Sequence, residues 1–293
     1  MPSGRIIKAL SGFYYVESEG EIFQCKGRGV FRKKKITPLV GDVVTFDISG
    51  KNEGYILEIH PRDNELIRPP IANINQAIIV CSAMKPVFST VLLDRFLVLV
   101  ESKGIKPVIF ITKMDLVADE AKNSLISYQK DYERVGYKVE QFSVKDSSVL
   151  ASLEQYFTNN ITVIAGQSGV GKTSLLNAIN PSLLLKTDEI SDSLGRGKHT
   201  TRHVELISLC GGLVADTPGF SSLDFQDIEP EELAACFPEI RDRMENCKFR
   251  GCMHYKEPKC AIKQAVESGE IASYRYQHYL RFLEEIQSRK PRY

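Results

Sequence analysis

The chain has 293 residues, of which 43% are hydrophobic and 26% are charged, close to the average of soluble globular proteins. This composition excludes a largely disordered chain and a collagen-like chain, and the length predicts two or three domains. The 38 basic and 37 acidic residues nearly cancel, so only local clusters of charge can indicate a nucleic-acid partner. Apolar runs such as residues 78–81 are far shorter than a membrane span of about 20 residues, and no secretory signal precedes them. We therefore expect a cytoplasmic protein with no membrane partner.

Short β-like runs fill residues 1–66, separated by glycines and charged turns. They lie at residues 6–7, 12–16, 21–25, 42–48 and 54–59. About five short strands in such a segment are typical of a small closed barrel of the OB type. The prolines at 69 and 70 then break the chain. We expect an N-terminal OB-type β-barrel that ends near residue 66.

A basic segment lies within this barrel region, at residues 26–35. It holds six basic residues and no acidic residue. On a barrel loop it would bind RNA phosphates, and OB barrels often bind oligonucleotides on one face. A solvated charged loop is the alternative. The candidate RNA-binding residues are Lys26, Arg28, Arg32, Lys33, Lys34 and Lys35.

Residues 67–221 alternate between strand and helix patterns. Residues 76–81 and 106–111 read as apolar strands that are buried on both faces, and residues 92–100 between them read as a helix. Further strands are predicted at residues 137–142, 162–165 and 212–216. This alternation predicts a central α/β domain with a mostly parallel sheet and helices on both faces.

A base-recognition motif follows the apolar strand at 106–111. It consists of Thr112, Lys113, Met114 and Asp115. The Asp115 carboxylate could accept hydrogen bonds from N1–H and the amino group of guanine, whereas adenine would leave it buried and unpaired. The Lys113 stem could cover the face of the base. Ser143, Val144 and Lys145 follow another predicted strand and could offer a backbone N–H to guanine O6. A helix-capping loop is the alternative interpretation of residues 112–115.

A phosphate-binding loop matches the full P-loop pattern between a predicted strand and a predicted helix. Its residues are Gly166, Gln167, Ser168, Gly169, Val170, Gly171, Lys172 and Thr173, followed by Ser174. The glycines let backbone N–H groups surround phosphate oxygens, and the helix start adds a positive dipole. We expect Lys172 to contact the β- and γ-phosphates as a catalytic residue and Thr173 to bind Mg²⁺.

A second magnesium contact is predicted at Asp216, which ends the strand at 212–216. Asp216 would hold Mg²⁺, through water, and the Gly219 N–H would contact the γ-phosphate. An ordinary β-turn is the alternative. In this chain the base motif precedes the phosphate loop, and Asp216 comes last, so the order is circularly permuted relative to an ordinary GTPase.

Residues 222–293 are predicted to be mainly helical and to bind one structural zinc ion. The four candidate ligands are Cys247, Cys252, His254 and Cys260. Three thiols and an imidazole suit tetrahedral Zn²⁺, and four protein ligands make the site structural. Unrelated core thiols are the alternative. Farther along, tyrosines alternate with charges at residues 274–281, which could form an RNA surface or a helix with its tyrosines turned inward.

Together, the barrel, the permuted motif order and the metal cluster closely resemble the ribosome small subunit-dependent GTPase A (RsgA) family over essentially the whole chain. The resemblance implies a GTPase that acts late in assembly of the small ribosomal subunit and binds its RNA. It also implies GTP hydrolysis that the subunit stimulates and that is coupled to release. We expect a monomer that binds GTP or GDP with Mg²⁺. One departure concerns Thr112, because the common base motif begins with Asn, so one hydrogen bond is expected to be lost.

The catalytic residue that positions water is harder to assign. Phe220 occupies the place of the Gln that orients the attacking water in Ras-like enzymes, so slow hydrolysis is expected without a partner. Within the predicted switch segment at residues 195–202, Thr200 or Thr201 would complete Mg²⁺ coordination. His199 is the candidate water-orienting residue, which the resemblance supports; a solvated loop residue or an RNA contact is the alternative.

Two other functions compete with a ribosome-assembly GTPase. An RNA-binding scaffold that barely hydrolyses GTP is favoured by Phe220 alone. A P-loop kinase for a small molecule leaves Asp115 and the basic segment at residues 26–35 unexplained. GTP turnover with and without small subunits separates the GTPase from the RNA-binding scaffold. Competition of bound GTP by ATP tests the kinase.

Overall fold

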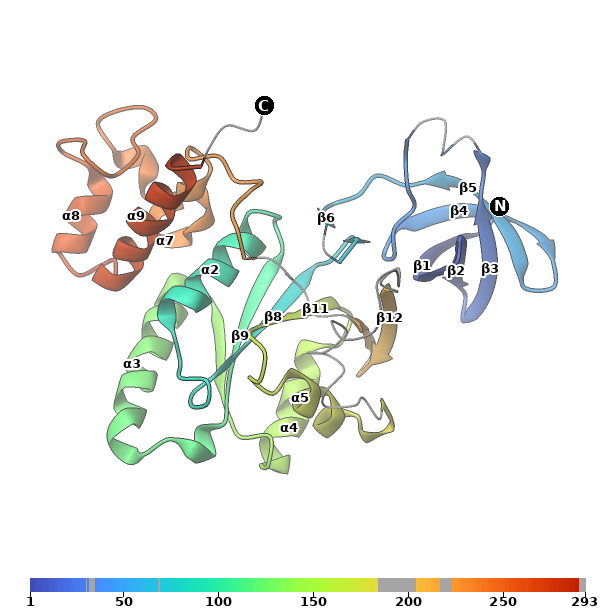
Figure 1. The fold of residues 1–293 in the computed structure, drawn as a ribbon, viewed down its shortest axis with the longest axis horizontal. Helices are drawn as coiled ribbons and strands as arrows, with labels where there is room; N and C mark the ends of the chain where they lie inside the picture. Colours follow the sequence, from blue (N-terminus) through green and yellow to red (C-terminus); the bar gives the residue numbers. More distant parts are fainter. Residues whose placement is uncertain (30, 32–34, 68, 184–203, 217–222, 290–293) are drawn as a thin grey trace. The chain divides into compact units, whose positions relative to one another are not determined.

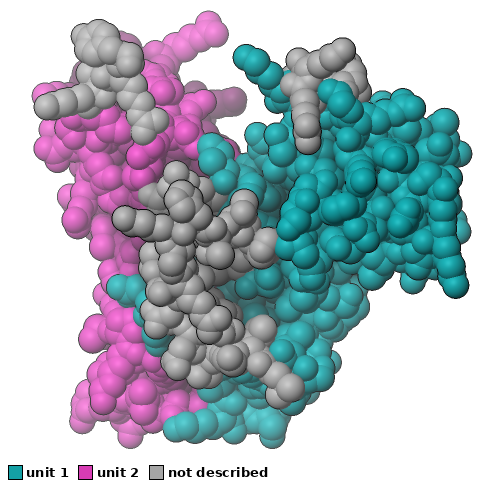
Figure 2. Space-filling view, turned by 45° about the vertical axis from the view of Figure 1, so that its right-hand side comes forward, with its two compact units in different colours: residues 1–78, 144–221 teal, residues 79–143, 222–293 magenta. Residues whose placement is uncertain are grey.

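The computed structural model describes residues 1–29, 31, 35–67, 69–183, 204–216 and 223–289. The chain forms two compact units, each built from two stretches that are distant in sequence (Figure 2). The first unit comprises residues 1–78 and 144–221, and the second comprises residues 79–143 and 222–293. The segment with the cysteine cluster therefore folds together with the early part of the α/β region.

The N-terminal segment forms a closed five-stranded barrel, as predicted (Figure 1). The strand order is β1-β2-β3-β5-β4, and β4 pairs back to β1. The strands are β1 (Ser3–Leu10), β2 (Phe13–Ser18), β3 (Glu21–Gly27), β4 (Val43–Gly50) and β5 (Glu53–Ile59). Inside the barrel, the rings of Phe23 and Phe46 pack with 5.1 Å between their centroids, so aromatic contacts fill its core.

The first unit also holds the strands around the phosphate loop. Strand β13 pairs in parallel with β11 and antiparallel with β12, and β12 pairs antiparallel with β1 of the barrel. These elements are β11 (Ile161–Ala165), β12 (Val204–Leu209), β13 (Gly212–Ala215), α4 (Ser147–Leu153) and α5 (Lys172–Ile179). The smaller elements of this unit are β6 (Glu65–Leu66), β7 (Ile71–Ala72), η2 (Glu154–Tyr156) and η3 (Pro181–Leu183). The predicted strands β11 and β13 are present, whereas β12 was not predicted.

The second unit begins with parallel strands and two helices. Strand β10 pairs in parallel with β9, and the strand order continues to β8. The elements are β8 (Gln76–Ser82), α2 (Thr90–Glu101), β9 (Lys106–Thr112), η1 (Met114–Leu116), α3 (Asp119–Val135) and β10 (Lys138–Gln141). Ser89 caps the N-terminus of α2, and its side chain accepts a hydrogen bond from the Leu92 N–H. The strands and α2 lie where the apolar runs predicted them, and α3 is an additional helix.

The C-terminal part of the second unit is mainly helical, as predicted. Its elements are η4 (Leu233–Cys236), α7 (Pro238–Arg241), η5 (Met244–Asn246), α8 (Ala261–Glu267) and α9 (Ser273–Gln287). Phe237, Tyr279 and Phe282 form its buried centre, and Val98 of α2 belongs to the same core. Over the described ranges, no helix combines the length and apolar character that crossing a membrane requires.

Candidate nucleotide and metal sites

The phosphate loop lies between β11 and α5 with a backbone that only glycine adopts readily. Gly166, Gly169 and Gly171 have φ values of 141°, 78° and 99°. A Cβ at Gly169 would meet no atom within 4 Å, so backbone conformation rather than space requires glycine there. The loop therefore has the left-handed turns that a run of inward N–H groups needs.

Lys172 is folded back over the phosphate loop. Its Nζ donates hydrogen bonds of 2.8 Å to the carbonyl oxygens of Gly166 and Gln167. The side chain is buried, and this burial lowers the pKa of Lys172. An anionic phosphate beside Nζ would favour the charged form again, so the site is electrostatically suited to a polyphosphate.

Asp216 lies at the same edge of the sheet as the phosphate loop. It follows β13, the loop follows β11, and these neighbouring strands are parallel, so both segments leave the carboxyl ends of adjacent strands. The Asp216 Oδ1 accepts a hydrogen bond of 3.0 Å from the Glu205 N–H, and burial raises the pKa of Asp216. Thr173, in the first turn of α5, is also buried. The structure thus brings together the described candidates for phosphate and magnesium binding.

In the second unit, the base motif and Ser143 meet at the ends of β9 and β10. The Ser143 Oγ donates a hydrogen bond of 2.8 Å to the Asp115 Oδ1 across 28 residues of sequence. The Met114 N–H donates to the Phe142 carbonyl at 3.3 Å. Lys113 has a left-handed backbone with φ 61°, which starts the short helix η1. Hydrogen bonds therefore join the base motif to the segment around Ser143, and both were predicted from sequence to contact the base.

Thr112 occupies the position where the common motif has Asn. It is buried, and its Oγ1 donates to the Cys81 carbonyl of β8 at 3.2 Å. The hydroxyl therefore links the ends of two neighbouring strands and supports the turn that carries Asp115.

Several predicted residues lie outside the described ranges. They are His199, Thr200, Thr201, Gly219, Phe220, Arg32, Lys33 and Lys34. Of the basic segment, Lys26, Arg28 and Lys35 are described, and all three are exposed. The Lys26 Nζ lies 5.1 Å from the centroid of the Phe13 ring. Val144 and Lys145 form a turn just before α4, and Ser174 lies within α5.

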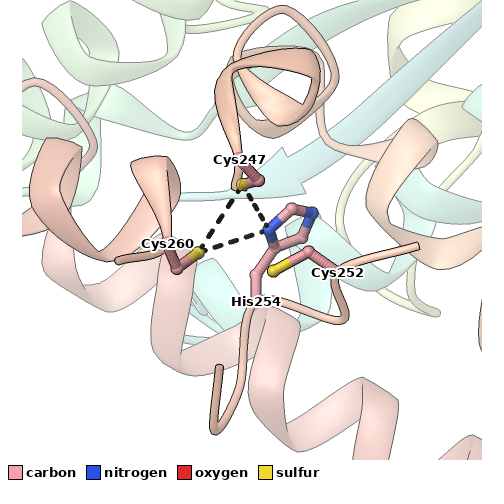
Figure 3. Close-up of side chains that lie close together, drawn as sticks. All are labelled: Cys247, Cys252, His254 and Cys260. Carbon is pink, nitrogen blue, oxygen red and sulfur yellow. Dashed lines mark hydrogen bonds between the residues drawn. The ribbon is translucent and has the colours of Figure 1, made fainter. Parts of the chain in front are cut away.

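The four predicted metal ligands converge in the C-terminal segment (Figure 3). Their ligand atoms all lie within 4.8 Å of one another. The Cys247 and Cys260 Sγ atoms are 3.9 Å apart, and they lie 3.5 Å and 3.4 Å from the His254 Nδ1. A tetrahedral zinc ion with ordinary bond lengths places two sulfurs about 3.8 Å apart and sulfur and nitrogen about 3.5 Å apart. The three-thiol, one-imidazole set therefore has the size and chemistry of one zinc site.

Protonation in this cluster also suits a cation. Burial lowers the pKa of His254, which keeps the imidazole neutral and able to bind a metal. Burial, together with the neighbouring thiols, raises the pKa of Cys252 to about 12. Such a thiol is protonated at neutral pH, so a cation must displace its proton to gain a thiolate ligand.

Residues that support the cluster were not assigned from sequence. The Glu257 carboxylate accepts hydrogen bonds from the N–H groups of Met253 and Tyr255, at 2.8 and 2.9 Å. The Tyr276 and Tyr279 hydroxyls each donate at 2.7 Å, to the carbonyls of His254 and Met253. Of the two interpretations of the tyrosine-rich helix, the inward-facing one is therefore correct for these tyrosines.

Comparisons with known families cover most of the chain. The family model described as RsgA GTPase matches residues 59–226, and the model described as RsgA N-terminal domain matches residues 3–56. The first match spans the base motif, the phosphate loop and Asp216. The second match covers β1 to β4 of the barrel and the first half of β5.

Full-length relatives give the same result. A protein of Oceanobacillus iheyensis named "Small ribosomal subunit biogenesis GTPase RsgA 2" is 65% identical over 293 residues, with 100% of both chains covered. The crystal structure of YloQ, a circularly permuted GTPase, is 57% identical, with a TM-score of 0.87 and coverage of 100% of this chain and 97% of that chain. The crystal structure of YjeQ from Thermotoga maritima is 37% identical, with a TM-score of 0.88 and coverage of 99% of both chains. The predicted permuted GTPase fold is thus confirmed.

Proposed function

The chain belongs to the RsgA GTPase family of GTP-hydrolysing enzymes, and from this premise we propose that it acts in maturation of the small ribosomal subunit. The observation that carries the proposal is 65% identity, over the whole length of both chains, to a relative named for small ribosomal subunit biogenesis. The phosphate loop and the Asp115–Ser143 pair supply the nucleotide chemistry that such a GTPase needs.

In this proposal the base motif binds the guanine base of GTP, and the phosphate loop binds its phosphates. Asp115 accepts hydrogen bonds from guanine N1–H and the amino group, and its bond to Ser143 holds the carboxylate in place. Lys113 and Met114 line the base with Thr112 behind them, and the 143–145 turn supplies an N–H to guanine O6. Adenine offers no donor on the edge that faces Asp115, so ATP would bind more weakly.

The phosphates are held by the loop at residues 166–173 and by Ser174 at the start of α5. Lys172 leaves its carbonyl partners and contacts the β- and γ-phosphates, while the Gly219 N–H contacts the γ-phosphate. Thr173 and either Thr200 or Thr201 would hold Mg²⁺, and Asp216 would hold it through water. When bound, Mg²⁺ neutralises charge on the phosphate oxygens.

Hydrolysis requires a residue that orients the attacking water. Phe220 cannot donate or accept a hydrogen bond through its side chain, so another group must hold the water. We assign this role to His199 and propose that binding to the subunit places it. Hydrolysis to GDP then accompanies release from the subunit.

Binding to the subunit is assigned to the barrel. The exposed Lys26, Arg28 and Lys35, with Arg32, Lys33 and Lys34 of the same segment, would bind phosphates of ribosomal RNA. The protein works as a cytoplasmic monomer in this proposal. One zinc ion, bound by Cys247, Cys252, His254 and Cys260, stabilises the C-terminal segment.

Steady-state GTP hydrolysis, measured with and without purified small ribosomal subunits, tests the proposal. We expect slow turnover by the protein alone and faster turnover with small subunits, but not with equal amounts of large subunits. Lys172→Ala is the control for contaminating GTPases. Equal turnover in all three conditions would remove the small subunit as the partner.

A further inference from the structure

Strand β1 is shared between the barrel and the sheet that carries Asp216. Its first residues pair with β4, where Gly4 lies opposite Val44, and its later residues pair with β12, where Lys8 lies opposite Glu205. A register shift between Ile6 and Lys8 marks a bulge in β1 against β2. Bulges re-aim side chains and end one pairing so that another can begin. The bulge therefore lies where β1 leaves β4 and reaches β12.

Lys8 and Glu205 form an ion pair across this strand junction. The Lys8 Nζ lies 2.7 Å from the Glu205 Oε2, and the two side chains are 33% and 35% exposed. The hydrogen bond to Glu205 raises the pKa of Lys8, so the cation persists throughout the physiological pH range. The pair thus connects the barrel to the start of β12 by a charged contact as well as by backbone pairing.

The backbone of Glu205 in turn holds Asp216 at two points. The Glu205 N–H donates to the Asp216 Oδ1 at 3.0 Å, and the Asp216 N–H donates to the Glu205 carbonyl at 2.9 Å. One bond fixes the main chain of Asp216 and the other fixes its carboxylate. Any displacement of Glu205 therefore moves the carboxylate directly.

We propose that Lys8 and Glu205 are positioning residues of the magnesium site. Their ion pair fixes Glu205, whose backbone forms the two hydrogen bonds that hold Asp216. This inference rests on the proposed role of Asp216 in holding Mg²⁺. The barrel strand β1 thereby contributes to the cation affinity of the GTPase sheet, although Lys8 itself contacts neither nucleotide nor cation.

The test measures binding of a fluorescent GDP analogue to the full-length protein as Mg²⁺ is titrated, and again in excess EDTA. The variants are Lys8→Met, Glu205→Gln, the double variant, and the charge-swapped pair Lys8→Glu with Glu205→Lys. We expect each single variant and the neutral double variant to need about two- to fivefold more Mg²⁺. We expect the Mg²⁺ requirement of the swapped pair to return toward the wild-type value. In excess EDTA, the affinity of every variant for the GDP analogue should equal that of the wild type.

A purely electrostatic effect gives a different pattern, which separates the alternatives. Removing the Lys8 cation would then tighten Mg²⁺ binding, removing the Glu205 anion would weaken it, and the neutral double variant would match the wild type. That pattern, or unchanged Mg²⁺ dependence in every variant, would overturn the proposal. Neutralising the Lys122–Asp119 pair on α3, with a separation of 2.8 Å, is the matched control.

Asp216→Asn keeps the two proposals distinguishable. If this variant loses its Mg²⁺ dependence while Lys8→Met needs no more Mg²⁺ than the wild type, the role of Asp216 stands and the positioning role of Lys8 fails. If Asp216→Asn retains the full Mg²⁺ dependence, the magnesium assignment itself fails. Thermal unfolding of each variant checks that the chain remains folded.

Discussion

Arg275 of α9 forms a buried ion pair with Asp94 of α2, although 181 residues separate them in the chain. Their side chains are only 2% and 0% exposed. The same guanidinium donates to both carboxylate oxygens of Glu239, at 2.7 and 2.9 Å, and the Tyr132 hydroxyl donates to Asp94 at 2.7 Å. This network fastens the C-terminal helix to α2 and α3, so the second unit is held together by charge as well as by its apolar core.

Removing one charge from this network should destabilise the second unit strongly. Arg275→Met leaves the buried carboxylates of Asp94 and Glu239 without their cation, and breaking a buried pair in this way costs about 3–5 kcal/mol. Urea titration followed by far-UV circular dichroism measures this loss in the transition that includes α9. Arg241→Met is the control, because the Arg241–Glu101 pair is 3.3 Å apart and Arg241 is 47% exposed. A loss below about 1 kcal/mol for Arg275→Met, the level of a surface pair, would contradict a structural role for the network.

Removing the proposed zinc ion should loosen the C-terminal segment before the rest of the chain. Without the cation, no shared ion joins the four ligand side chains to one another. Hydrogen bonds such as those from Tyr276 and Tyr279 to the carbonyls of the loop would then be left to hold it in place. Hydrogen exchange after chelation should rise first around residues 247–260 and later in β11 and α5. Cys260→Ser should lower bound zinc, whereas Cys210→Ser, outside the cluster, should keep one equivalent. Uniform loosening of both units would exclude a local structural role for the metal.

The Ser143 hydroxyl should contribute to guanine binding through Asp115. Ser143→Ala removes the 2.8 Å hydrogen bond that orients the carboxylate. This bond is present before nucleotide binds, so only its effect on the orientation of the carboxylate reaches GTP affinity, which should fall by about two- to tenfold. Fluorescence titration measures this change. Ser152→Ala, which removes a hydroxyl from α4 that donates to the Val149 carbonyl, should leave the affinity unchanged.

The proposed role of His199 predicts a loss confined to hydrolysis. His199→Ala should lower turnover stimulated by small subunits by about 10²-fold, because a side chain that positions or activates water contributes on that scale. Nucleotide affinity should stay close to wild type, since His199 does not hold the base or the phosphates in this account. Single-turnover hydrolysis and equilibrium binding separate the two effects. Stimulated turnover at the wild-type rate would remove His199 from the mechanism.

The functional loops could be predicted from sequence because each is a short, continuous pattern. Glycines at fixed spacing, an acid after an apolar strand and closely spaced cysteines are chemical requirements that survive without tertiary context. The barrel was also accessible, because its strands are short and close together. In each case the pattern that predicts the structure lies within a few neighbouring residues.

Other features depend on long-range contacts and escaped the sequence analysis. Helix α3 buries only Leu125 and Tyr132, so its apolar stripe is too weak to predict a helix. Strand β12 is six residues long and pairs with β1, which is distant in sequence, and with β13, which follows it. Arg275 reads as a surface charge until the fold places two carboxylates beside it. Such pairings are decided by topology rather than by local pattern.

The proposed GTPase function depends most directly on recognition of guanine by Asp115. The most direct measurement compares GTP and XTP binding to Asp115→Asn, with Asp146→Asn, a change at the N-cap of α4, as the matched control. Xanthine carries a carbonyl in place of the guanine amino group, so the side-chain amide that this substitution introduces can donate to it where a carboxylate cannot. We expect the variant to lose GTP affinity and gain XTP affinity, with subunit-stimulated hydrolysis following the preferred nucleotide. Unchanged GTP affinity in Asp115→Asn would contradict the account.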